Sequence, residues 1–99
     1  MALRVKISAR AAAQTRRAAD WWLQNRPAAP GAVVKDDGES IALLAEQSGI
    51  GAKYEGARTP GVRRLFLGRI GYFLYYRVHD GTLEVLALWH ASRGEPPRV

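Results

Sequence analysis

The sequence predicts an α+β domain in which a helical hairpin packs on one face of a mostly antiparallel sheet. Helix-forming residues are concentrated in the first half of the chain, strand-like apolar segments fill the second half, and short glycine-containing turns separate those segments. The expected order of elements is β-α-α-β-β-β. With 99 residues, of which 47% are hydrophobic, the chain suits a single domain, 1–99, with its own core.

The first predicted elements are a short strand and a long helix. Residues 3–7 alternate between apolar and polar side chains, which is typical of a strand with one solvated face. Ser8 is expected to cap the helix that follows, because a serine side chain accepts hydrogen bonds from the unpaired N–H groups of a first turn. Residues 9–26 are rich in the helix formers Ala, Arg and Gln, and Pro27 ends this helix.

Residues 32–48 predict a second helix, with an open question near its centre. Apolar residues recur there at helical spacing, but Asp37-Gly38 interrupts them. Glycine inside a helix costs about 1 kcal/mol relative to alanine, so the helix either continues through this point or breaks and restarts. Gly49 is the expected C-terminal cap, and residues 49–61, with four Gly and one Pro, are predicted to form a loop.

Three strands are predicted in the rest of the chain, at 62–67, 72–78 and 82–89. A Gly68–Gly71 connection joins the first two, and Asp80-Gly81 is a typical two-residue hairpin turn between the second and third. The tail after these strands, 95–99, contains two prolines and cannot extend the sheet, so an irregular tail is expected.

The last two predicted strands are apolar on both faces. In the first of them Tyr72, Leu74 and Tyr76 alternate with Phe73 and Tyr75, and in the second Val85, Ala87 and Trp89 alternate with Leu86 and Leu88. Two helices cover only one face of a sheet. The other face is therefore either covered by the long loop or open as an interaction site for a protein partner.

The net charge of +6 is unevenly distributed along the chain. Residues 1–31 contain six Lys/Arg and one Asp, and residues 53–99 contain eight Lys/Arg and four acidic residues. Residues 32–52 are acidic, with one Lys and four acidic residues. This balance either serves solubility alone or fits an acidic partner, such as a nucleic acid or an acidic protein segment.

Several classes of site are disfavoured by composition. The chain has no Cys and only two His, and no metal-ligand spacing appears, so neither a metal site nor a disulfide is expected. Gly49-Ile50-Gly51 lacks the Lys-Ser/Thr of a phosphate-binding loop, and no cofactor is expected. No apolar run has the length of a membrane helix or the pattern of a signal peptide, which predicts a cytoplasmic protein without membrane association.

The segment Leu86–Gly94 contains the main candidate functional residues. An apolar strand ends there in the polar residues His90, Ser92 and Arg93, and groups just past a buried strand project from a rigid platform. Arg63 and Arg64 are further candidates. Neighbouring residues of a strand face opposite ways, so only one of these two arginines is expected to face a partner.

Four segments are similar to one known family of proteins. They are Trp21-Trp22 with Asn25-Arg26-Pro27, Gly61-Val62-Arg63-Arg64-Leu65, Gly71-Tyr72 through Tyr75-Tyr76-Arg77-Val78, and Trp89-His90-Ala91-Ser92-Arg93-Gly94. Over about residues 5–95 the chain resembles the ParE branch of the RelE/ParE superfamily of bacterial toxins, also known as plasmid stabilisation proteins. The resemblance implies the β-α-α-β-β-β fold and a role as the toxin of a type II toxin–antitoxin pair.

The resemblance also implies partners. ParE-like toxins poison DNA gyrase by trapping its cleavage complex, whereas RelE-like toxins cut mRNA on the ribosome. Both are neutralised by an antitoxin that wraps around the toxin in a hetero-oligomer. Such wrapping would cover an apolar sheet face, so the expected antitoxin contacts are Tyr72, Leu74, Tyr76 and Arg77. The expected target contacts are Arg63, Arg64, His90, Ser92 and Arg93.

The residues around His90 favour binding over catalysis. RNA cleavage needs a base, an acid and cations for the phosphate, and His90 with Arg64 and Arg93 supplies only part of that set. RNA-cutting relatives carry a Tyr, Lys, Asp or second His nearby, where this chain has Ala91 and Ser92. We therefore predict a toxin that binds gyrase without catalysis. The alternatives are an mRNA endonuclease that uses His90, Arg64 and Arg93, and a non-toxic member that only binds its antitoxin.

Overall fold

The computed structural model describes residues 2–99 and confirms the predicted α+β order. The elements are β1 (Arg4–Ile7), α1 (Ala9–Asn25), α2 (Ala32–Glu46), the 3-10 turn η1 (Ser48–Ile50), β2 (Ala52–Lys53), β3 (Arg63–Leu67), β4 (Tyr72–His79) and β5 (Thr82–His90). The short strand β2 was not predicted and lies within the expected loop. Asp80 and Gly81 both have positive φ angles, 50° and 70°, which confirms the predicted tight turn between β4 and β5.

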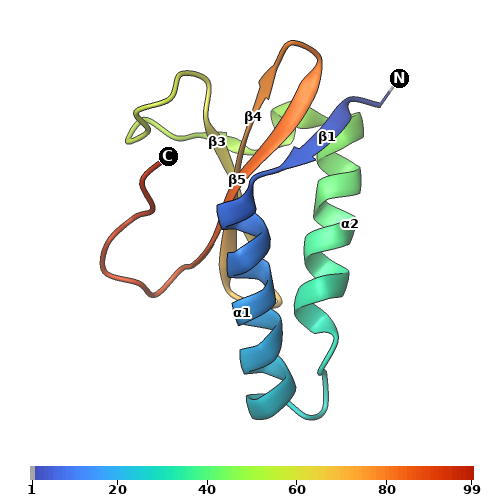
Figure 1. Ribbon diagram of the computed structural model, residues 1–99. Coiled ribbons are helices and arrows are strands. Elements are labelled where there is room, and N and C mark those ends of the chain that lie inside the picture. The colour runs from blue at the N-terminus through green and yellow to red at the C-terminus, as the bar shows by residue number, and fades with distance from the viewer. Residues whose placement is uncertain (1) are drawn as a thin grey trace.

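The five strands form one sheet in the order β1-β5-β4-β3-β2. β1 pairs in parallel with β5, and every other pair is antiparallel. Figure 1 shows α1 and α2 side by side as a hairpin, while the loop before β3 and the C-terminal coil lie on the side away from α2. The first and last strands are therefore neighbours, and the end of β5 lies beside α1.

Two side chains of the α1 region complete the edge of β5 where β1 stops. Ser8 is the predicted cap: its hydroxyl accepts a hydrogen bond from an N–H of the first helical turn at 3.0 Å. The same hydroxyl donates to the carbonyl of Leu86, and the buried Gln14 accepts from the N–H of Leu88 at 2.9 Å. Buried backbone groups need hydrogen-bond partners, so these contacts fix α1 against the second half of β5.

α2 is continuous through Asp37-Gly38, which resolves the open question about this helix. The side chains of Val33 and Leu44 are fully buried on either side of the glycine. Burial of one such side chain contributes about 2 kcal/mol, which exceeds the cost of the glycine. The expected cap at Gly49 is wrong, because α2 ends earlier, at the cap residue Gln47, and Gly49 lies in η1.

The main core lies between the helical hairpin and the sheet. Its buried members are Ala11, Ala18, Ala32, Val33, Leu44, Ala45, Leu67, Ile70, Leu74, Tyr76, Leu83, Val85 and Leu88. Val85 was expected to share a face with Ala87, but the pairing of β4 with β5 shifts between Tyr75 and Tyr76. Tyr75 pairs with Ala87 and Tyr76 with Val85, so Leu86 forms a β-bulge and Val85 turns toward the helices.

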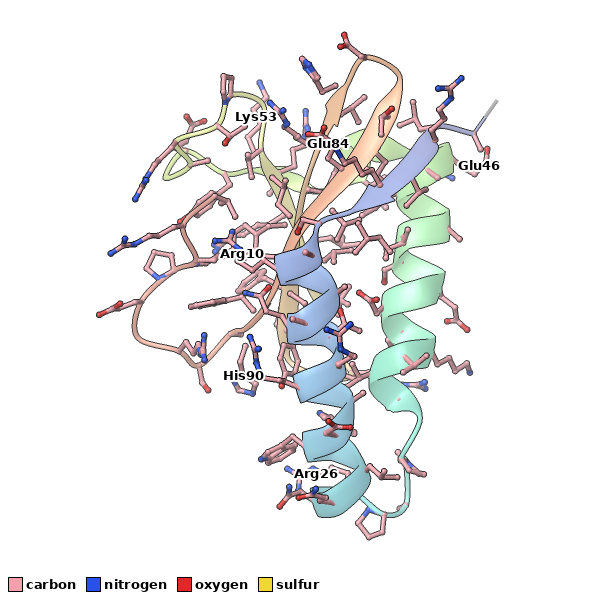
Figure 2. The ribbon with its side chains drawn as sticks, viewed as in Figure 1. Arg10, Arg26, Glu46, Lys53, Glu84 and His90 are labelled. Carbon is pink, nitrogen blue, oxygen red and sulfur yellow. The ribbon has the colours of Figure 1, made fainter. Side chains whose placement is uncertain are left out.

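The second face of the sheet is covered by the chain itself. A second cluster contains Val62, Tyr75, Ala87 and Val99, with Tyr54, Ala57, Phe73, Leu86 and Trp89 packed against it. The tail has no helix or strand, but the carbonyl of Val99 accepts from the N–H of Thr59 at 3.1 Å. Arg10, at the start of α1 in Figure 2, donates to the carbonyl of Arg98 at 2.7 Å. The loop and the tail therefore form part of the core and cover much of this face, while Phe66 in β3 remains 52% exposed.

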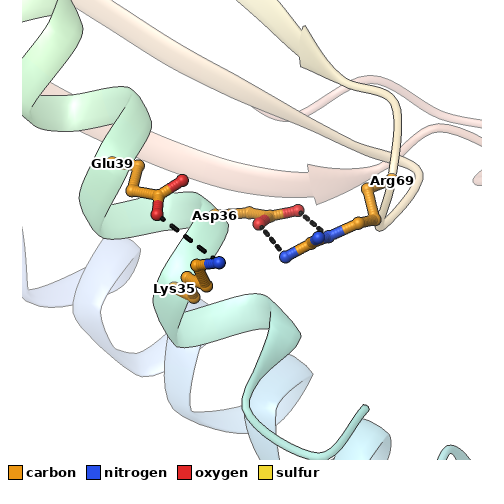
Figure 3. Close-up of polar contacts among 4 residues, drawn as sticks. All are labelled: Lys35, Asp36, Glu39 and Arg69. Carbon is orange, nitrogen blue, oxygen red and sulfur yellow. Dashed lines mark hydrogen bonds and ion pairs between the residues drawn. The ribbon is translucent and has the colours of Figure 1, made fainter.

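An ion pair ties α2 to the turn between β3 and β4. The guanidinium of Arg69 donates to both carboxylate oxygens of Asp36, at 2.9 and 3.1 Å (Figure 3). Lys35 and Glu39, one turn apart, form a weaker pair with 3.9 Å between Nζ and Oε1. The Asp36–Arg69 fork holds the hairpin turn against the helix, because two parallel bonds fix its geometry.

Asp37 destabilises the protein at neutral pH. Its Oδ1 is buried and has no hydrogen-bond partner within residues 2–99, and burial raises the pKa of Asp37 from 3.8 to about 6. Between these two pH values the folded state binds more protons than the unfolded state, so stability falls as pH rises. After discounting for partial solvent exposure, Asp37→Asn should raise the free energy of unfolding at pH 7.5 by about 1–2 kcal/mol.

Urea unfolding at pH 7.5 and pH 4 measures this effect. At pH 4 the Asp37 carboxyl is largely protonated in the folded state, so Asp37→Asn should change stability far less there. Asp36→Asn is the matched control and should lower stability at pH 7.5, because it removes half of the fork with Arg69. If Asp37→Asn raised the free energy of unfolding equally at pH 7.5 and pH 4, the destabilisation could not come from the ionised Asp37 carboxylate.

Candidate functional site

The imidazole of His90 is held in one orientation at the end of β5. The N–H of Ser92 donates to Nδ1 of His90 at 3.1 Å, and the Ser92 hydroxyl lies 2.6 Å from the same nitrogen. The His90 ring also packs edge-on against Tyr72, with 4.9 Å between centroids. Because a backbone N–H can only donate, Nδ1 is an acceptor, and the proton of the neutral ring lies on Nε2. The ring therefore offers a donor to a ligand rather than a basic nitrogen, and Ser92 positions it.

Arg64 and Arg93 stack on the aromatic rings of two paired residues on one face of the sheet. The guanidinium carbon of Arg64 lies 4.1 Å from the centroid of Phe73, and that of Arg93 lies 4.1 Å from the Trp89 ring. Phe73 and Trp89 are paired residues of β4 and β5. Stacking orients a guanidinium and leaves donors at its edge for a ligand, although one Arg64 donor already bonds the Tyr75 hydroxyl at 3.2 Å. With His90, both arginines line a hollow of about 180 Å³.

Arg63 lies apart from this cluster. Its guanidinium donates to the carbonyl of Gly51 at 2.7 Å, next to η1, and also lies 3.4 Å from the carbonyl of Gly49. Of the two neighbouring arginines, Arg64 is therefore the one that joins His90 and Arg93. The sequence predicted that only one of the pair faces this site but did not identify which.

The four residues expected to contact an antitoxin do not form one exposed surface. Leu74 and Tyr76 have no exposed area, because they face the helical hairpin, so their assignment as partner contacts is wrong. Tyr72 is half-buried beside His90. Arg77 pairs with Glu84, and this hydrogen bond lowers the pKa of the Glu84 carboxyl. The alternation along β4 was predicted correctly, but it does not indicate which face the helices cover.

A second hollow, of about 230 Å³, lies between α1 and the end of β5. Its lining residues are Gln14, Arg17, Ala18, Trp21, Tyr72, Leu88, His90 and Arg93. Figure 2 shows His90 beside α1, with Arg26 at the far end of the helix. Arg17 and Trp21 were not among the predicted site residues. The four α1 residues recur at helical spacing, so one stripe of the helix carries them, but no local pattern links that stripe to β5.

Electrostatics in this second hollow are set by its cations. Burial raises the pKa of the Tyr72 hydroxyl, and the nearby charge of Arg93 partly opposes that rise. Among residues 2–99, none with a carboxylate side chain lines the hollow. Within residues 2–99 no group of three His, Cys, Asp or Glu side chains gathers at one point, and no helix is long and apolar enough to span a bilayer. The side chains that line this second hollow are hydrogen-bond donors, cations and aromatic rings together with apolar residues.

Comparison with known proteins identifies the family. A family described as the ParE toxin of type II toxin–antitoxin system, parDE, matches residues 5–94. A solved structure, described as a chromosomal ParDE toxin–antitoxin system from P. aeruginosa, superimposes with a TM-score of 0.73 and 24% identity, covering 91% of this chain and 97% of that chain. At this identity the structural likeness shows the fold. No curated protein sequence matches. Since the family match spans nearly the whole chain, the protein belongs to the ParE toxin family of type II toxin–antitoxin systems.

Proposed function

We propose that this protein inhibits DNA gyrase by binding it and that a cognate antitoxin neutralises the toxin. The observation that carries this proposal is the group Arg64, His90 and Arg93, which are fixed by stacking and hydrogen bonds at the rigid end of the sheet. Preorganised donors of this kind favour binding, because little side-chain entropy is lost when a partner docks. Membership of the ParE family supports gyrase as the target.

The alternative is an mRNA endonuclease that uses the same residues. Cleavage would need a base, and the Nδ1 atom of His90 already accepts hydrogen bonds. In the described part of the chain, Glu95 is the one acidic residue that lines the hollow with Arg64 and Arg93. Substitution of Glu95 therefore distinguishes the two activities. A toxin that only binds does not need the Glu95 carboxylate, whereas an endonuclease would need that carboxylate as the base.

We propose that the antitoxin adds an extended, acidic segment to the edge of β1. All four residues of this edge strand are exposed, including Val5 at 45% and Ile7 at 48%. Unpaired backbone groups of an edge strand readily accept another strand. Arg4 and Lys6 alternate with these apolar residues, so the same edge also attracts carboxylates.

Induced expression in a bacterial host tests the proposed function. The wild-type chain should arrest growth and cause DNA breaks while mRNA stays intact, and co-expression of its cognate antitoxin should restore growth. Glu95→Gln should be as toxic as the wild type. Ordered mRNA cuts that disappear in Glu95→Gln would support the endonuclease instead, and the absence of growth arrest by the wild type would contradict a toxic role.

A further inference from the structure

We propose that the hollow between α1 and the end of β5 binds a single strand of nucleic acid, with a phosphate at Arg17, His90 and Arg93 and an unstacked base against Trp21. This inference extends the target surface of the proposed function onto α1. A role for this site in binding the DNA held by gyrase rests on the proposed function. The binding of a single strand itself can be tested with the isolated protein.

The positions of the cations support a phosphate. Arg17 comes from α1, whereas His90 and Arg93 come from the end of β5, so three donors reach one hollow from two sides. Neither arginine forms an ion pair within residues 2–99. A guanidinium without a carboxylate partner keeps its paired donors for a phosphate, which it binds in a bidentate manner.

The backbone of β5 adds a further donor. The N–H of Leu88 points to the strand edge that faces α1, where Gln14 accepts its hydrogen bond. Along a strand the same orientation recurs every second residue, so the N–H of His90 points to this edge as well. Backbone N–H groups commonly contact phosphate oxygens and fix the register of a bound nucleic acid.

Trp21 favours a single strand over other anions. Its side chain lines the hollow and is 47% exposed, and the guanidinium of Arg26 lies 5.3 Å from its ring centroid. An exposed aromatic ring beside cations is typical of sites that stack an unpaired base. The bases of a duplex are already stacked, and an acidic peptide would use the arginines but not the ring. A volume of about 230 Å³ is below that of pockets for drug-sized ligands, and it suits a group of about one nucleotide.

Fluorescence anisotropy with the purified full chain tests this proposal. The probes are a short labelled oligothymidine, the same oligonucleotide in a duplex, and a polyglutamate peptide of equal charge. Oligothymidine should bind about fivefold or more tightly than either competitor, since base stacking adds to the phosphate contact. Duplex or polyglutamate binding of equal strength would overturn the proposal.

Three variants locate the site. Trp21→Leu should weaken oligothymidine binding about tenfold without changing its salt dependence, because it removes stacking but no charge. Arg17→Gln should weaken binding and reduce the salt slope by about 0.7, which corresponds to one phosphate contact. Arg16→Gln is the matched control: it is an exposed neighbour on the same helix that does not line the hollow. If Arg16→Gln weakened oligothymidine binding as much as Arg17→Gln does, the proposed site would be overturned.

The gyrase assay separates this inference from the proposed function. Inhibition of gyrase by a toxin that does not bind oligothymidine would overturn the nucleic-acid site alone. Oligothymidine binding with unaffected gyrase would overturn the gyrase target alone. Unfolding midpoints of the three variants should match the wild type, because Arg16, Arg17 and Trp21 are all exposed side chains.

Discussion

Arg93→Ala should remove most of the inhibitory activity while the protein stays folded. Arg93 lines both hollows at the end of β5, and its guanidinium stacks on Trp89 at 4.1 Å. Arginines in such central positions often contribute about 2 kcal/mol or more to a protein interface, which corresponds to about a 30-fold higher toxin concentration for half-inhibition. Titration of the purified variant against gyrase measures this shift, and urea unfolding checks the fold.

Arg98→Ala is the matched control for this prediction. Arg98 also lies in the C-terminal segment and is exposed, but its known contact is made through the backbone carbonyl, which alanine keeps. The control should inhibit gyrase as well as the wild type does. Arg93→Lys should retain part of the activity, because it keeps the charge but loses the stacked, planar guanidinium. Full activity of Arg93→Ala, or an equal loss in Arg98→Ala, would remove Arg93 from the target surface.

Gly51→Ala should lower the free energy of unfolding by about 3 kcal/mol, because it combines overpacking with the loss of a buried hydrogen bond. A methyl group on Gly51 would overlap the hydroxyl of Tyr76. That hydroxyl donates to the carbonyl of Ser48 at 2.6 Å and accepts from the N–H of Gly51 at 2.9 Å. Tyr76 is fully buried in the main core, so it cannot move aside without breaking both bonds.

Urea unfolding of Gly51→Ala beside Gly49→Ala tests this point. Gly49 lies in η1, two residues away, and an added methyl group there meets no atom within 4 Å, so this control should change stability little. Tyr76→Phe should also destabilise the protein, since it leaves the Ser48 carbonyl and the Gly51 N–H unpaired. The double variant should cost less than the sum of the two, because the same bonds are lost only once. Equal stability of the two alanine variants would show that the contact is not rigid.

Features of the fold that depend on neighbouring residues could be predicted from the sequence. The cap at Ser8 and the turn at Asp80-Gly81 depend on the chemistry of a few adjacent side chains. The bulge at Leu86 could not be predicted, because the alternation of apolar residues assumes an unbroken register. The packing of Val99 over the second sheet face also could not be predicted, because it depends on contacts between distant segments.

The site residues that β3 and the end of β5 contribute could be predicted from the sequence, but those that α1 contributes could not. His90, Ser92 and Arg93 belong to one short run, and the structure places them together. Arg17 and Trp21 are about seventy positions away, and only the packing of α1 beside β5 brings them to the same hollow. The exposed contacts of an antitoxin could not be predicted from β4, because strand alternation shows two faces without indicating which one the helices cover.

A gyrase assay with the purified wild-type chain tests the central claim most directly. Supercoiling and DNA cleavage would be measured together, with mRNA on translating ribosomes examined in parallel. The proposed function predicts inhibited supercoiling, accumulated cleaved DNA and intact mRNA. Unaffected gyrase together with ordered mRNA cuts would contradict the claim and assign His90 to catalysis.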